Sequence, residues 1–164
     1  MNSIIHWKKP IFNNASSIYS ADGKIGELTE NQWKQTAEGE LNNRKYSYRT
    51  RGFINQLTEI VDPASKDIVG KIEYNTWKSS ATITYLDQSF HWKYDNPWQT
   101  RWSITDKLGV STNFQGNQLK GSIEGPDLSE FLVLTGLFIT NYYIQSTIVI
   151  MVAIFVPIIT TLTN

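Results

Sequence analysis

The sequence predicts a mainly β protein: a closed antiparallel β-barrel of about eleven or twelve strands with a hydrophobic C-terminal helix through or against it. Apolar residues between Ile4 and Glu124 fall in short runs with a period near two, separated by Asp, Asn, Gly and Pro. Helical spacing is nearly absent there. From Phe131 to Asn164, in contrast, no side chain is charged. Since many antiparallel strands in a short chain leave open edges unless the sheet closes, closure is favoured.

The predicted strands follow one another along the chain. Three are clearest because they are rich in β-branched and aromatic residues, and they cover residues 68–74, 80–86 and 89–94. Residues 86–89 read as a hairpin turn between the last two. The other expected strands cover residues 4–8, 17–20, 24–29, 45–50, 54–61, 98–105, 110–114 and 118–124.

The chain also resembles itself at several places. Asp22, Asp62 and Asp106 each lie between one strand and a following strand that bears a glycine, and His-Trp-Lys occurs at both His6 and His91. Either the chain has two related halves, or these are ordinary hairpins in which Asp starts the turn and Gly takes a positive φ. Both interpretations predict consecutive hairpins.

Composition and charge exclude several classes of function. Lys plus Arg and Asp plus Glu are equal at 15 each, so no net field attracts the chain to nucleic acid or to an anionic membrane surface. We therefore expect no nucleic-acid partner, and the sequence assigns no protein partner. The absence of cysteine excludes disulfides and thiolate chemistry and fits a reducing compartment. The N-terminus lacks the apolar core of a secretory signal peptide, so we expect a cytosolic N-terminal domain.

No catalytic constellation is recognisable. The two histidines, His6 and His91, lie beside tryptophans in predicted strands, and no third ligand has metal-site spacing. An enzyme that used both would need the imidazoles within about 5 Å. We expect structural roles for them, no metal, no cofactor and no enzymatic activity. We expect the six tryptophans to fill the barrel interior and its rims, rather than to stack on bases.

The uncharged segment begins with a helix start signal. Pro126 ends the last strand, Asp127 is a good N-cap, and Glu130 completes a capping box, so a helix is expected from near Leu128. Residues 127–145 are apolar on nearly every face until Asn141 and must be surrounded by protein or by lipid.

Three arrangements of this segment compete. In the first, residues 127–145 fill the barrel and a second helical tail from Ser146 crosses or enters a membrane. In the second, one helix spans a bilayer from about Leu132 to Phe155; in the third, both runs insert as a hairpin. Tyr142 and Tyr143 fit the first and third as interfacial aromatics, whereas Asn141 in mid-bilayer counts against the second.

We rank the first arrangement highest, with a barrel domain over residues 1–145 and a membrane anchor over residues 146–164. The expected barrel-core residues of the helix are Phe131, Leu132, Leu134, Leu137 and Phe138. The expected anchor residues are Ile148, Val149, Ile150, Val152, Ile154 and Phe155.

Several segments together resemble the tubby C-terminal-like superfold, which includes the LURP-one-related proteins and the phospholipid scramblases. They are the aspartate–glycine turns at Asp22 and Asp106, residues 92–98 leading into 102–106, the strand at 118–123 and the apolar helix after it. The resemblance covers roughly residues 4–145. It implies a barrel of about twelve strands with a hydrophobic helix threaded through its centre. The run after Ser146 is an addition to that pattern.

The resemblance also implies a lipid-related function. Members of the superfold that are understood interact with lipids, and tubby-type headgroup binding uses a basic surface cluster. Here Arg49 and Arg51 can share one strand face and are the candidate headgroup contacts. The alternative is a solvated strand whose basic side chains protect a sheet edge. We therefore expect a non-enzymatic, membrane-associated barrel with membrane lipid as its partner. The alternative is a soluble small-ligand-binding barrel whose whole C-terminal tail is buried or self-associating.

Overall fold

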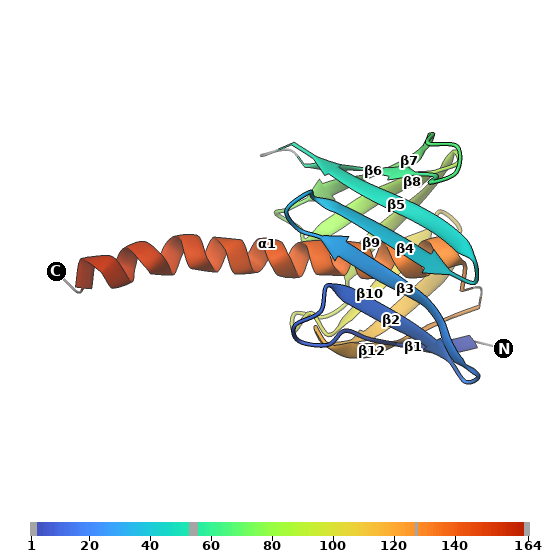
Figure 1. Ribbon diagram of the computed structural model, residues 1–164, viewed down its shortest axis with the longest axis horizontal. Coiled ribbons are helices and arrows are strands. Elements are labelled where there is room, and N and C mark those ends of the chain that lie inside the picture. The colour runs from blue at the N-terminus through green and yellow to red at the C-terminus, as the bar shows by residue number, and fades with distance from the viewer. Residues whose placement is uncertain (1–2, 53–55, 127, 163–164) are drawn as a thin grey trace.

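The computed structural model describes residues 3–52, 56–126 and 128–162, without the side chains of 149, 150 and 155–162. These residues form a closed antiparallel barrel of twelve strands around one helix, α1 (Figure 1). The predicted fold class is therefore confirmed. The strands are β1 (Ser3–Lys8), β2 (Ala15–Ser20), β3 (Gly23–Asn31), β4 (Thr36–Leu41), β5 (Arg44–Arg51), β6 (Leu57–Val61), β7 (Ile68–Asn75), β8 (Ser80–Tyr85), β9 (Gln88–Tyr94), β10 (Arg101–Asp106), β11 (Ser111–Gly116) and β12 (Lys120–Gly125), and the helix is α1 (Glu130–Leu162).

Each strand pairs with its neighbours in the sequence, and β1 pairs with β12 to close the barrel. All odd-numbered strands consequently run toward one end, from which α1 emerges (Figure 1). We call this end the mouth and the opposite end the base. The mouth loops are residues 9–14, 32–35, 52–56, 76–79, 95–100 and 117–119.

The predicted strands correspond to eleven of the twelve, with shifts at their ends. The strand expected from residue 98 begins at Arg101, because Trp98 lies in the preceding turn. The strand expected from residue 54 is described from Leu57, since residues 53–55 lie outside the described part of the chain. β4 (Thr36–Leu41) was not predicted.

The hairpin turns use the expected chemistry. Leu86 and Asp87 both have positive φ, 45° and 64°, and link β8 to β9 as a two-residue turn of the type that matches strand twist. The Asp62 carboxylate accepts the Ala64 N–H at 2.7 Å, and the Asp106 carboxylate accepts the N–H groups of Leu108 and Val110 at 2.8 Å. This confirms turn chemistry for two of the repeated aspartates.

The helix start differs from the prediction. α1 begins at Glu130, and its N-cap is Ser129, whose Oγ accepts the Leu132 N–H at 3.2 Å. The helix thus begins two residues after Leu128, while the expected cap Asp127 lies outside the described residues. The Glu130 side chain accepts a hydrogen bond from the Asn42 amide in the β4–β5 turn instead.

The second helical tail of the prediction is also corrected. One helix runs without a break from Glu130 to Leu162, through the Gln145–Ser146 position at which two segments were expected. It enters the barrel at the base, passes along the axis and leaves through the mouth (Figure 1). The first arrangement therefore places the first half of the helix correctly in the barrel but has the wrong number of helices, and its membrane location for the second half stays a prediction.

Close contacts fix how α1 sits in the barrel. A Cβ at Gly136 would lie 2.2 Å from Phe114 Cζ, and a Cβ at Gly39 would lie 3.0 Å from the Leu134 side chain. Tyr48 shares a buried hydrogen bond of 3.0 Å with Thr135. Small residues on the helix and on β4 thus let the helix approach the wall, as in a densely packed interior.

Candidate functional site

The burial of α1 changes sharply along its length. The predicted core residues Phe131, Leu134, Leu137 and Phe138 are buried in the barrel, and Leu132 is partly buried. Farther along, Ile148, Met151, Val152 and Ile154 expose more than half of their side-chain surface. Three predicted anchor residues, Ile148, Val152 and Ile154, are among these; the side chains of Val149, Ile150 and Phe155 lie outside the described residues.

The apolar character of α1 extends past the point where its burial ends. The helix is long and apolar enough over Glu130–Ile154, with a mean hydropathy of 1.6, to cross a membrane. Only its first part is surrounded by protein, so the surface that remains apolar and uncovered begins at the mouth.

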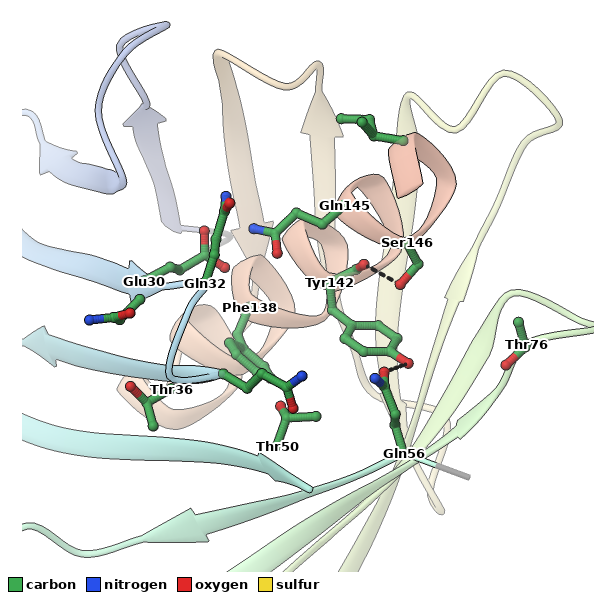
Figure 2. A pocket seen from close by; sticks show the side chains of 13 residues that line it. Glu30, Gln32, Thr36, Thr50, Gln56, Thr76, Phe138, Tyr142, Gln145 and Ser146 are labelled. Carbon is green, nitrogen blue, oxygen red and sulfur yellow. Dashed lines mark hydrogen bonds between the residues drawn. The ribbon is translucent and has the colours of Figure 1, made fainter. Parts of the chain in front are cut away.

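Two tyrosines fix α1 to the wall at the mouth. The Tyr143 hydroxyl donates to the Ser80 carbonyl at 2.6 Å, and its ring stacks on Trp92. The Tyr142 hydroxyl donates to the Gln56 side chain (Figure 2). Its ring stacks on Tyr74 at 3.8 Å between centroids. Burial raises the pKa of both hydroxyls, which keeps them protonated as donors. These tyrosines, expected as interfacial aromatics, pack against the barrel wall.

A cavity of about 540 Å³ opens beside the helix at the mouth (Figure 2). Its wall combines the apolar Phe138 and Ile148 with side-chain amides and hydroxyls from the mouth loops, the adjoining strand ends and α1. The amides are Asn31, Gln32, Gln35, Gln56 and Gln145, and the hydroxyls include Thr36, Thr50, Thr76 and Ser146. Such a lining offers many neutral hydrogen-bond donors and acceptors to a polar group.

One carboxylate, Glu30, lines this cavity. It is 8% exposed, and the Lys9 ammonium lies 2.7 Å from its Oε2. Burial raises the pKa of Glu30 above its ordinary value of 4.5, although Lys9 and Asn141 act in the opposite direction. Desolvation thus outweighs the ion pair. The folded state therefore binds a proton at Glu30 more tightly than the unfolded state does.

Barrel stability should therefore depend on pH through Glu30. Because the folded state binds the proton more tightly than the unfolded state, the free energy of unfolding falls as pH rises from the ordinary carboxyl pKa through the raised one. Glu30→Gln should flatten this fall, while Lys9→Met, which removes the compensating cation, should steepen it. Urea unfolding across this pH range measures both. A fall with rising pH that persists unchanged in Glu30→Gln contradicts the assignment.

The two candidate headgroup residues, Arg49 and Arg51, project from the outer face of β5. Their Nε atoms both lie 3.2 Å from Glu59 Oε2, although neither N–H has hydrogen-bond geometry. They share one face, as expected, but they are not part of the cavity wall. Glu59 offsets part of their charge.

The two histidines do not come together. His6 and His91 are exposed on β1 and β9, and β12, β11 and β10 lie between these strands. Four steps of about 4.8 Å separate them by roughly 19 Å along the wall. The structure thus gives no support to a site that uses both imidazoles. Within the described residues, no cluster of His, Cys, Asp or Glu is arranged for a metal ion.

The tryptophans divide into two groups. Trp7, Trp92 and Trp102 are buried in the barrel, as expected for its interior. Trp33, Trp77 and Trp98 project from mouth loops and are 99%, 99% and 82% exposed. The exposed position of these three was not predicted; the signal in the sequence is the Asn-x-Trp pattern that all three share and the buried tryptophans lack.

Comparison of the chain with protein-family models, curated proteins and solved structures gives no match. The class of protein therefore follows from the fold and the mouth site alone. The protein is a closed β-barrel whose C-terminal apolar helix fills the barrel and continues outside it. This architecture fits a membrane-associated barrel.

Proposed function

We propose that the protein is a non-enzymatic barrel held on a membrane, with its barrel domain in the cytosol and the outer half of α1 in the bilayer. The observation that carries the proposal is the change in burial along one uninterrupted apolar helix. The first half has its apolar partners inside the barrel. The second half needs an apolar environment that the described barrel does not provide.

The exposed residues point in several directions from the helix axis. Successive residues are about 100° apart around an α-helix, so the four consecutive exposed residues from Met151 to Ile154 lie on different sides. An amphipathic helix docked on one surface would cover one side only. Exposure on several sides favours lipid, which surrounds a helix completely.

We further propose that the mouth cavity receives the polar part of a membrane lipid. The cavity lies where α1 leaves the barrel, so lipid headgroups next to the helix would meet its amides and hydroxyls. The resemblance to the tubby-like superfold supports a lipid-related role. Arg49 and Arg51 remain predicted contacts for anionic headgroups on the outer wall, weakened by Glu59.

A second candidate is a soluble, small-ligand-binding barrel whose emergent helix associates with other copies. The exposed Ile148, Met151 and Val152 also favour this possibility. Burial of the whole tail within the same chain, the other form of that hypothesis, is wrong because these side chains are exposed. The two candidates differ in whether detergent is needed to keep the protein in solution.

Carbonate extraction of cells that contain the protein distinguishes the candidates. The full chain should remain in the membrane pellet, and a chain without residues 146–164 should move to the soluble fraction. The shortened chain keeps the core half of α1, including Tyr142 and Tyr143. Recovery of the full chain in the soluble fraction would show that the anchoring proposal is wrong.

A further inference from the structure

The mouth loops share a feature that membrane anchoring by α1 does not require. Five of the six mouth loops have at least one exposed large apolar side chain. The sixth loop, residues 52–56, contains residues 53–55, which the structure does not describe. The exposed residues are Ile11, Phe12, Trp33, Trp77, Trp98 and Leu119. We call them the mouth ring.

Three hairpins of the mouth ring hold a tryptophan in the same way. Asn31, Asn75 and Asn96 each stand two residues before the indole, and each side-chain oxygen accepts a backbone N–H from the far side of the turn at 3.0–3.2 Å. The residue that closes each turn has positive φ: 52° at Gln35, 47° at Ser79 and 57° at Gln99. The three turns are thus closed by the same chemistry, and each leaves its indole exposed to solvent.

All exposed aromatic side chains with a described exposure lie at this end. The base also exposes aliphatic residues, among them Leu86 and Leu108, but none is aromatic among those described. Single exposed apolar residues are common on protein surfaces. A set that recurs at the same turn position around one end indicates a surface that contacts something.

Charge also distinguishes the two ends. The mouth loops carry Lys9, Lys34 and Lys78 against Asp95, and Lys9 is already paired with Glu30. The base loops are residues 21–22, 42–43, 62–67, 86–87, 107–110 and 126–129. Their described residues include four aspartates against two lysines, namely Asp22, Asp62, Asp67 and Asp87 against Lys66 and Lys107. The mouth is therefore the end that complements an anionic surface.

The path of α1 places the mouth loops directly beside the start of its exposed apolar segment. Tyr143 is still fixed to the wall, and the first strongly exposed apolar side chain, Ile148, follows five residues later, which is about 7.5 Å of helix. No charged or flexible spacer separates the barrel from the exposed apolar segment. If that segment is in lipid, the loops around it lie at headgroup depth.

We propose that the mouth ring is a bilayer-contact surface, in which Trp33, Trp77 and Trp98 insert into the headgroup region of an anionic membrane and fix the barrel axis relative to it. This rests on the anchoring proposed above and adds a second, separate contact. Indoles prefer this region because their rings are apolar and their N–H groups remain hydrated. The ring and the helix together hold the mouth cavity against the lipid headgroups.

Quenching by brominated lipid tests this contact. The full chain is reconstituted in vesicles of phosphatidylcholine and phosphatidylglycerol whose acyl chains are brominated near the headgroup, and flotation of the same sample reports anchoring. About half of the tryptophan emission should be quenched, because three of the six tryptophans belong to the ring. Each single Trp→Phe variant at positions 33, 77 and 98 should lose about a third of that quenching.

The triple variant Trp33→Phe, Trp77→Phe, Trp98→Phe should still float with the vesicles but show almost no quenching. Adding Leu108→Trp to the triple variant places an exposed indole at the base, and this indole should restore no quenching. If the full chain floats but is not quenched, the ring does not contact lipid, whereas anchoring stands. Failure to float would overturn both proposals. A blue-shifted but unquenched emission would indicate a protein contact at the mouth and would also overturn the lipid assignment.

Discussion

Replacing Leu134 with aspartate is expected to prevent the barrel from folding. Leu134 is fully buried at the centre of the barrel and packs onto Gly39 of β4. Loss of the leucine side chain costs about 2–5 kcal/mol. Burial of an unpaired carboxylate adds several more. The sum is comparable with the whole stability of a typical domain, about 5–15 kcal/mol.

Circular dichroism and thermal unfolding measure this effect. The variant should lose its cooperative transition, whereas Leu134→Met, which keeps the volume, should cost less than about 1.5 kcal/mol. A folded, cooperative Leu134→Asp protein would mean that α1 does not form the barrel core in solution.

An aspartate in the outer half of α1 should leave the barrel folded but weaken its binding to the membrane. Val152→Asp leaves the barrel core untouched, because Val152 is 56% exposed and lies beyond the mouth. A carboxylate near the centre of a membrane helix costs about 2.5–3.5 kcal/mol of insertion free energy, roughly a hundredfold shift toward the unbound state. The variant should therefore be folded and depleted from the membrane.

Fractionation combined with unfolding measurements separates these effects. Val152→Ala serves as the control, since it keeps the segment uncharged and should remain in the membrane fraction. If Val152→Asp unfolds the barrel, or if it fractionates as Val152→Ala does, the outer half of α1 does not have the role assigned to it.

The strand pattern was predictable because most inward-facing positions carry large β-formers. β4 is the exception that was missed: its inward residues are Ala37, Gly39 and Leu41, and two glutamates point outward. Its small side chains leave room for α1, as the contact between Gly39 and Leu134 shows. Strand propensity carries no information about such a contact, because the partner is almost a hundred residues away.

The continuity of α1 was not predictable from the polar residues near residue 145. Asn141, Gln145 and Ser146 suggested an end, yet the hydroxyls of Ser146 and Thr147 donate to the carbonyls of Tyr142 and Tyr143 at 2.9 Å. Such bonds to the preceding turn keep polar side chains compatible with a helix. Asn141 is buried at the mouth beside Glu30, so it does not have to enter lipid.

The mouth site could be predicted only in part. The core and anchor residues of the helix follow from hydropathy and length, but the sequence does not say which loops meet at one end until the strand count is known. Successive loops of an antiparallel barrel lie at alternate ends. When β4 is left out of the count, every loop after β3 and its following turn is assigned to the wrong end, so Trp77 and Trp98 are placed opposite Trp33. The mouth ring therefore becomes visible only in the closed barrel.

Spin labelling along α1 tests most directly whether one helix is both barrel core and membrane anchor. The chain has no cysteine, so single cysteines can be introduced without background labelling. Labels at Met151, Val152 and Ile154 in membranes should be accessible to oxygen and shielded from a water-soluble nickel chelate, whereas a label at Thr82 on the outer wall should be open to the chelate. A Leu137→Cys thiol should stay unreactive until the barrel is unfolded. Nickel accessibility at the three outer positions equal to that at Thr82 would contradict the account.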